Sequence, residues 1–149
     1  MKLFNLRPEE YETMLLEMAT DRKNAHILIR GLGKQIFLHL IKVIKWEDDI
    51  NYNKHIADID NWIYNIQSIK YKPKNKRFSN RQYYQWMYDD LFGDIEDMKV
   101  FLKQYLSNYV NLPEKMSNFE LITKLKEIYK QLTYDISKGK FDGIESYLK

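Results

Sequence analysis

Apolar residues recur every three or four positions along most of the chain, which is the spacing of one face of an α-helix. After Asp21 the first clear series is Ala25, Leu28, Leu32, Ile36, Leu40 and Val43. Two later series of the same kind are Tyr52, Ile56, Ile59, Ile63 and Ile66, then Leu121, Leu125, Ile128, Leu132 and Ile136. They predict long helices from about Asp21 to Trp46, over 52–66 and over 118–136. No stretch alternates apolar and polar residues for long enough to predict a β-strand.

Capping residues mark where these helices begin and end. Ser79 and Gln82 have the spacing of a capping box, in which two side chains satisfy the free amides of a first helical turn. Ser117 and Glu120 repeat this pattern before the last long helix. Gly139 follows that helix at the place where a C-terminal glycine is expected.

Two further helices and a short turn complete the pattern. Pro8 fits the first turn of an N-terminal helix, and a long helix is predicted from the Ser79 cap to Tyr105, with Gly93 as its weak point. The apolar face of the N-terminal helix would be Tyr11, Met14, Leu15 and Met18. Asp142 is expected to cap a short final turn that contains Ile144. Together these elements predict an all-α fold, a single compact bundle of five to six helices in one domain over 1–149, with a basic loop near its middle.

Gly31 and Gly33 interrupt the helix that is predicted to end near Trp46. Inside a helix each glycine costs about 1 kcal/mol relative to alanine. The pair therefore indicates a kink, a break between two shorter helices or the close approach of a neighbouring element. Lys34 follows, but Gln35 stands where a phosphate-binding loop requires serine or threonine, so that motif is excluded.

The composition fits a chain that folds around its own core, and it narrows the chemistry. Hydrophobic residues make up 44% of the sequence, and no run approaches the roughly 18 apolar residues that span a bilayer. The absence of cysteine excludes disulfides, thiolate nucleophiles and cysteine-bound metal centres. It also suits a reducing compartment, so we expect a cytoplasmic protein. The net charge of +3 is too small to indicate a nucleic-acid partner by itself.

The most unusual feature is a basic segment that leads directly into an aromatic one. No acidic residue lies within 70–81, and the basic residues there are Lys70, Lys72, Lys74, Lys76, Arg77 and Arg81. Lysine and arginine neutralise phosphates, while aromatic faces stack on unpaired bases. The segment 70–88 is therefore typical of a site for RNA or single-stranded DNA. The alternative is a solvated loop in a lysine-rich protein.

The aromatic part of this segment, 83–88, places rings on every side of one helix. A single core cannot cover all sides of such a helix. Some of Tyr84, Trp86 and Tyr88 should therefore be exposed or covered by a partner, because aromatic side chains often anchor interfaces. The alternative is that this helix passes through the centre of the bundle and is buried all round.

An acidic stretch follows at 89–97, in which Asp90, Asp94 and Asp97 share one helix face. Together with His55 they would form the metal-assisted site of a hydrolase. Helical bundles that hold two metal ions use Glu-x-x-His pairs, and this chain contains none. A solvated acidic face is therefore the favoured interpretation, and we expect no metal and no cofactor.

The functional expectation follows from these motifs. None of His26, His39 and His55 has a sequence neighbour that completes a catalytic pair. We expect a small non-enzymatic protein that docks on a macromolecular partner, either a protein or a ribonucleoprotein, as a monomer or a homo-oligomer and without a membrane. In style it resembles the small inhibitors and host-modulating proteins of phages and mobile elements. Two alternatives stay open: direct binding of RNA or single-stranded DNA through 70–88, and a metal-assisted hydrolase that uses 89–97.

Overall fold

The structure, a computed structural model, describes residues 22–46, 50–70, 76–90 and 114–149, together with four single positions between 96 and 104. Its elements in chain order are α2 (Arg22–Lys45), α3 (Tyr52–Ser68), α4 (Asn80–Tyr84), the π-helix η3 (Gln85–Asp89), α7 (Asn118–Ser137) and α8 (Glu145–Leu148). These described elements are all helical, so the all-α prediction is confirmed. The helix predicted at the N-terminus, and most of 91–105, lie outside the described residues.

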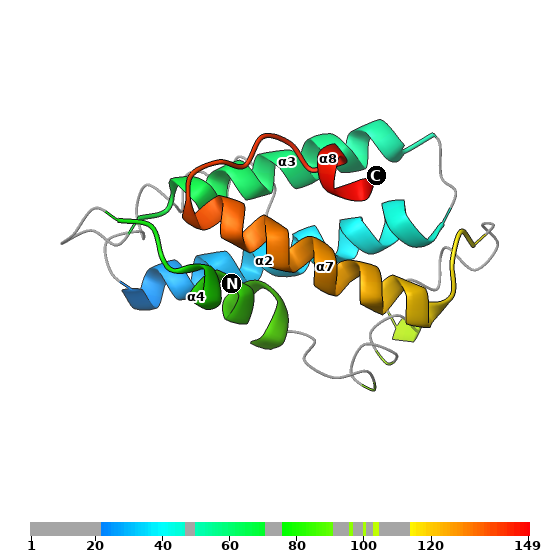
Figure 1. Ribbon diagram of the computed structural model, residues 1–149, viewed down its shortest axis with the longest axis horizontal. Coiled ribbons are helices and arrows are strands. Elements are labelled where there is room, and N and C mark those ends of the chain that lie inside the picture. Colours follow the sequence, from blue (N-terminus) through cyan, green and yellow to red (C-terminus); the bar gives the residue numbers. More distant parts are fainter. Residues whose placement is uncertain are drawn as a thin grey trace.

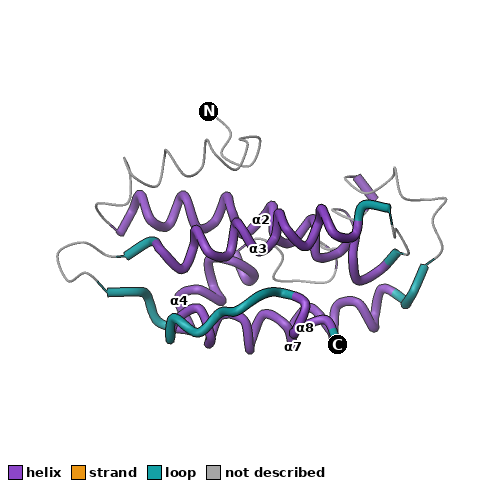
Figure 2. Tube along the Cα trace, turned by 90° about the horizontal axis from the view of Figure 1, so that it is seen from above, coloured by secondary structure: helices purple, strands orange, loops and turns teal. Residues whose placement is uncertain are grey.

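The helices form two layers (Figure 2). α2 and α3 lie side by side in one layer, and α7 lies in the other, with α4 next to it and the short α8 beside its middle. Many of the fully buried side chains come from the three predicted apolar faces. Among them are Leu28, Leu32, Ile36 and Leu40 of α2, Ile59, Ile63 and Ile66 of α3, and Leu121, Leu125, Leu132 and Ile136 of α7. Burial of these faces is the main favourable contribution to the fold.

The two glycines of α2 do not break it, because the helix runs unbroken from Arg22 to Lys45. Gly33 marks the close approach of a neighbour. A Cβ atom there would lie 3.1 Å from the Cα atom of Met87 in η3. Of the three interpretations that the sequence left open, close approach is the one that the structure shows at Gly33.

Hydrogen bonds confirm both predicted serine caps. The Ser79 hydroxyl oxygen accepts the Gln82 amide at 3.1 Å, and the Ser117 hydroxyl oxygen accepts the Glu120 amide at 3.2 Å. Gly139 ends α7 with a φ of 69°, a left-handed conformation that glycine adopts without strain.

The predicted cap of the final turn was wrong. α8 begins after Ile144 rather than after Asp142. The Ile144 amide donates instead to the Asp60 carboxylate of α3, at 2.7 Å. This contact joins residues that are far apart in the chain, so local sequence spacing gave no sign of it. None of the helices that the structure describes is long and apolar enough to cross a membrane.

Candidate nucleic-acid interface

Three segments meet at one end of the bundle: the end of α3, the residues that lead into α4, and the end of α7 (Figure 1). Two hydrogen bonds hold them together. The Phe141 amide, just after α7, donates to the Gln67 side chain of α3 at 3.2 Å. The Thr133 hydroxyl of α7 donates to the side-chain oxygen of Asn80, the first residue of α4, at 2.9 Å.

Basic side chains gather on these three segments. We call the set the basic end, and it comprises Lys70, Lys76, Arg77, Arg81, Lys138 and Lys140. Four of its members, Lys76, Arg81, Lys138 and Lys140, are exposed, while Lys70 and Arg77 are half-buried. In the part of the chain that the structure describes, Lys76, Arg81 and Lys140 form no salt bridge. Their charge therefore faces solvent and is available to an anionic partner.

The side chain of Arg77 is held in position by packing against the end of α7. Its guanidinium lies against Gly139, where a Cβ atom would come within 2.8 Å of the Arg77 Cζ atom. Since α7 ends beside Gly139, the guanidinium also lies near the negative end of that helix dipole. The chain next to Arg77 is fixed as well, because the Phe78 amide donates to the Tyr83 hydroxyl at 3.1 Å. Burial raises the pKa of this tyrosine, so the hydroxyl stays protonated at neutral pH.

Four of these six basic residues were predicted from the sequence, whereas Lys138 and Lys140 were not. These two follow α7, far along the chain from 70–81, and only the packing of α7 on α4 brings them close. The other two predicted basic residues, Lys72 and Lys74, lie outside the described residues.

Two exposed tyrosines border the basic end and were also missed. Tyr134 is 45% exposed in the last turn of α7, and the ammonium of Lys138 lies 5.7 Å from the centre of its ring. Tyr64 is 43% exposed on α3, and its ring meets that of Phe141 edge to face at 5.1 Å. The pairing of Tyr134 with Lys138 four residues later is visible in the sequence and was the available signal.

Trp86 and Tyr88 require a correction, because the structure buries both inside the chain. Trp86 is 4% exposed and Tyr88 is 2% exposed, so neither offers its ring to a partner. The reason is that η3 lies between two helices. Trp86 stacks on His26 of α2 at 4.6 Å, and Tyr88 packs against Tyr129 of α7 at 5.1 Å. Burial raises the pKa of Tyr88 to about 12.

Tyr84 is half-buried and packs on Tyr88, with 5.3 Å between the ring centres. It is the one aromatic residue of the three singled out from the sequence that retains substantial accessible surface. Of the three aromatic side chains expected to anchor a partner at 84–88, Tyr84 alone is accessible.

The acidic residues do not converge on His55 within the described part of the chain. Asp90 faces His26 instead, with 3.8 Å between the carboxylate oxygen and Nε2. Asp94 and Asp97 lie outside the described residues. Among the residues that are described, no group of three acidic or histidine side chains could hold a metal ion.

His55 lies between the helices of the α2–α3 layer. Its ring meets that of His39 at 5.1 Å, and His39 in turn meets Trp62 at 4.8 Å. Burial and, to a smaller degree, the nearby Lys42 ammonium lower the pKa of His39 to about 4. The His39 ring is therefore neutral at physiological pH. It is half-buried, with its Nδ1 atom 3.0 Å from the Gln35 carbonyl oxygen.

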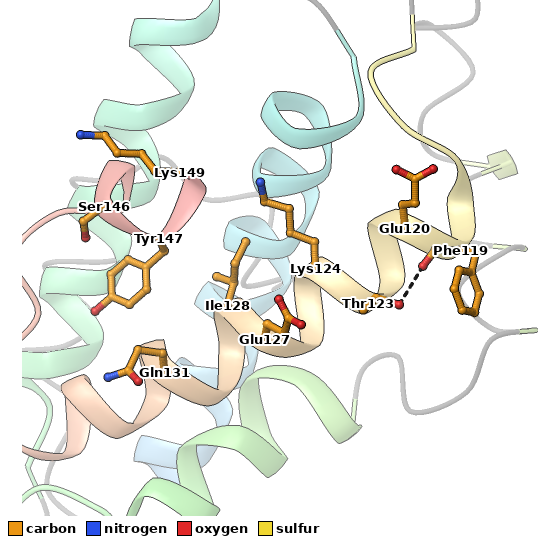
Figure 3. A pocket seen from close by; sticks show the side chains of 10 residues that line it. All are labelled: Phe119, Glu120, Thr123, Lys124, Glu127, Ile128, Gln131, Ser146, Tyr147 and Lys149. Atoms are coloured by element: carbon orange, nitrogen blue, oxygen red, sulfur yellow. Dashed lines mark hydrogen bonds between the residues drawn. The ribbon is translucent and has the colours of Figure 1, made fainter.

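A groove of about 530 Å³ lies between α7 and α8 (Figure 3). Phe119, Ile128 and Tyr147 contribute its apolar surface. Lys124 lines the groove as well, but its ammonium already donates to the Leu148 carbonyl at 3.0 Å. The remaining charged lining residues, Glu120, Glu127 and Lys149, carry mixed signs. The groove thus lacks the convergent polar groups that define a specific ligand site.

No known family matches this chain. A scan against protein-family models finds no match, and searches of the curated proteins and of the solved structures find none either. The functional proposal therefore rests on the chain's own residues, and the basic end is the feature with the clearest chemical preference.

Proposed function

We propose that this protein is a non-enzymatic docking protein that binds the phosphate backbone of nucleic acid through its basic end. One observation carries the proposal: basic residues from two stretches that lie far apart in the sequence, 70–81 and 138–140, meet at one end of the bundle. The packing of α7 on α4 adds the charge of the second stretch to that of the first.

The energetics of phosphate binding agree with this arrangement. Each phosphate that a lysine or arginine neutralises releases counterions, which is the main favourable contribution to non-specific binding of nucleic acid. The basic end offers four exposed cations for this purpose, Lys76, Arg81, Lys138 and Lys140. Arginine also binds two phosphate oxygens at once, and Arg77 is already held in place by Gly139 before any partner arrives.

The nearest acidic groups leave most of this charge uncompensated. Asp135 lies in the last turn of α7, three residues before Lys138, and its carboxylate is engaged in two hydrogen bonds. Its carboxylate accepts from the Tyr147 hydroxyl at 2.5 Å and from the Gln131 amide at 3.0 Å. Asp142 is exposed on the segment after Lys140 and is the acidic residue that offsets part of the positive potential.

A ribonucleoprotein contains both protein and nucleic acid, so it fits the docking interpretation as well as the nucleic-acid interpretation. It is the partner class that we propose, and we place the interaction in the cytoplasm. The role of an inhibitor or host-modulating protein of a phage or mobile element agrees with the composition.

The test is a comparison of two variants that lose the same charge. The first carries Lys76→Ala, Arg81→Ala, Lys138→Ala and Lys140→Ala, all at exposed positions of the basic end. The control carries Lys54→Ala, Lys103→Ala, Lys126→Ala and Lys149→Ala, which are exposed positions outside those three segments. Each protein is titrated into labelled RNA and DNA oligonucleotides, and binding is followed by fluorescence anisotropy at low salt.

We expect the wild type and the control to bind within about threefold of each other and the basic-end variant to bind at least about tenfold more weakly. An equal loss of affinity in both variants would show that binding depends on the net charge of the protein and not on the position of the basic residues. No binding of any oligonucleotide by the wild type would overturn the proposal and direct the search to an acidic protein partner.

A further inference from the structure

Two exposed aromatic side chains lie next to the basic end. Within the described residues, six large hydrophobic side chains are exposed: Ile27, Ile50, Tyr64, Val100, Phe119 and Tyr134. The two tyrosines among them, Tyr64 and Tyr134, both lie next to the connection that follows α7. That connection carries Lys138, whose ammonium lies near the Tyr134 ring, and Phe141, which meets the Tyr64 ring.

Tyr134 and Lys138 form the closest combination of this kind. They are four residues apart at the end of α7, and the Lys138 ammonium lies 5.7 Å from the centre of the ring, within the range of a cation–π contact. The tyrosine is 45% exposed. An exposed ring and a positive charge therefore lie together here, and these are the two kinds of group that the base and the phosphate of a nucleotide would contact.

Tyr64 offers a second aromatic surface on the neighbouring helix. Its ring is held at 69° to the buried ring of Phe141, with 5.1 Å between the centres. Phe141 is itself anchored to α3, because its amide donates to Gln67. Tyr64 thus has a supported orientation and still keeps 43% of its surface exposed.

We propose that the basic end selects single-stranded nucleic acid, with Tyr64 and Tyr134 as stacking surfaces for unpaired bases and the adjacent lysines as phosphate contacts. This inference rests on the proposed function and names the substrate class of the same site. Bases in a duplex are already stacked on one another, so exposed rings stabilise binding only where bases are unpaired. Stacking on aromatic rings is tolerant of sequence, so no strong sequence preference is expected.

The test separates stacking from charge by using a ligand that has phosphates but no bases. Four oligomers of about twelve nucleotides are compared, a length within the site sizes of known single-strand binders. They are oligouridine, oligodeoxythymidine, an abasic oligomer with the same phosphates, and a DNA duplex. The first two distinguish RNA from DNA as the source of the single strand.

The variants isolate the two rings. Tyr64→Ala with Tyr134→Ala removes the stacking surfaces, and Tyr64→Phe with Tyr134→Phe restores them without the hydroxyls. Phe119→Ala is the matched control, because Phe119 is 76% exposed at the other end of α7. Circular dichroism verifies that each variant keeps the helical fold.

We expect the wild type to bind the single strands about tenfold or more tightly than the abasic oligomer. The double alanine variant should lose this advantage and bind the abasic oligomer as the wild type does. The phenylalanine variant and Phe119→Ala should stay within about threefold of the wild type. Equal wild-type affinity for single-stranded and abasic oligomers would overturn the stacking inference and leave the basic end intact as a phosphate site. No affinity for any of the four would instead overturn the proposed function itself.

Discussion

The guanidinium of Arg77 occupies the space that a side chain at Gly139 would fill. This packing joins the basic segment before α4 to the end of α7. It requires glycine at position 139 for two reasons. The φ of 69° at Gly139 favours a residue without a Cβ atom, and the arginine requires the same absence. The contact explains why the positive charge of two distant segments accumulates at one place.

Gly139→Ala is expected to destabilise the protein by about 2 kcal/mol. About 1 kcal/mol comes from the left-handed backbone conformation, and the rest comes from displacement of the Arg77 side chain. Urea unfolding followed by circular dichroism measures the change in the free energy of unfolding.

The Arg77→Ala background separates these two contributions. There the Gly139→Ala substitution should cost only the backbone part, so the two substitutions together should cost less than the sum of their separate effects. Strict additivity would contradict the contact between Arg77 and Gly139.

Gly33→Ala is expected to destabilise the protein even though alanine is the better helix former. A free helix would gain about 1 kcal/mol from this change. Here the new methyl group would lie 3.1 Å from the Met87 Cα atom, and backbone atoms move aside less easily than a flexible side chain. Overpacking of this kind typically costs about 1–3 kcal/mol. A higher melting temperature for the variant would show that η3 yields easily and would contradict a tight contact with α2.

Stability should fall in mild acid because of His39. Its folded-state pKa is about 4, while an ordinary histidine, such as that of the unfolded chain, has a pKa of about 6.5. Between these values the unfolded chain binds the proton and the folded protein does not. This contribution is therefore fully present above about pH 6.5 and is lost as the pH falls towards 4, by on the order of 3 kcal/mol. Urea unfolding at a series of pH values in this range measures it.

His39→Gln keeps an amide donor near the Gln35 carbonyl but cannot take up a proton. Between about pH 6.5 and 4 the free energy of unfolding of this variant should depend less steeply on pH. The difference in slope should correspond to at most one proton taken up on unfolding. An unchanged slope would assign the acid sensitivity to groups other than His39.

Asp60→Ala is expected to loosen the C-terminal segment. The Asp60 carboxylate accepts the Ile144 amide, and loss of a hydrogen bond to a charged group costs about 1.5–3 kcal/mol. Hydrogen exchange at Ile144 and in α8 should be faster in this variant. Asp142→Ala is the matched control and should change little, since Asp142 is exposed and does not cap α8. Faster exchange in the control variant would restore the sequence-based assignment of the cap.

Local features of the fold were predictable from sequence because their causes are local. The apolar faces of α2, α3 and α7 follow from helical spacing, and the serine caps need only residues three positions apart. The glycine at the end of α7 was predicted for the same reason. Even the close approach at Gly33 was among the stated alternatives, although its partner, Met87, was not.

Features that depend on tertiary packing were not predictable. Trp86 and Tyr88 are buried because α2 and α7 enclose η3 from two sides, which the sequence of η3 alone does not reveal. The proximity of Lys138 to the segment 76–81 likewise depends on tertiary packing, in this case that of α7 on α4. The sequence pointed to the basic residues of the proposed site but not to Tyr64 and Tyr134, the exposed rings beside them.

The central claim is that phosphates bind at the basic end, and the most direct measurement is the salt dependence of binding. Affinity for oligodeoxythymidine is measured between about 50 and 200 mM salt for the wild type, the basic-end variant and the charge-matched control. The slope of log affinity against log salt changes by about 0.7 for each phosphate contact to a single strand. Loss of four contacts should therefore flatten the slope by up to about 3 in the basic-end variant and leave it unchanged in the control. A slope that is the same in all three proteins would contradict the account, because it would place the phosphate contacts elsewhere.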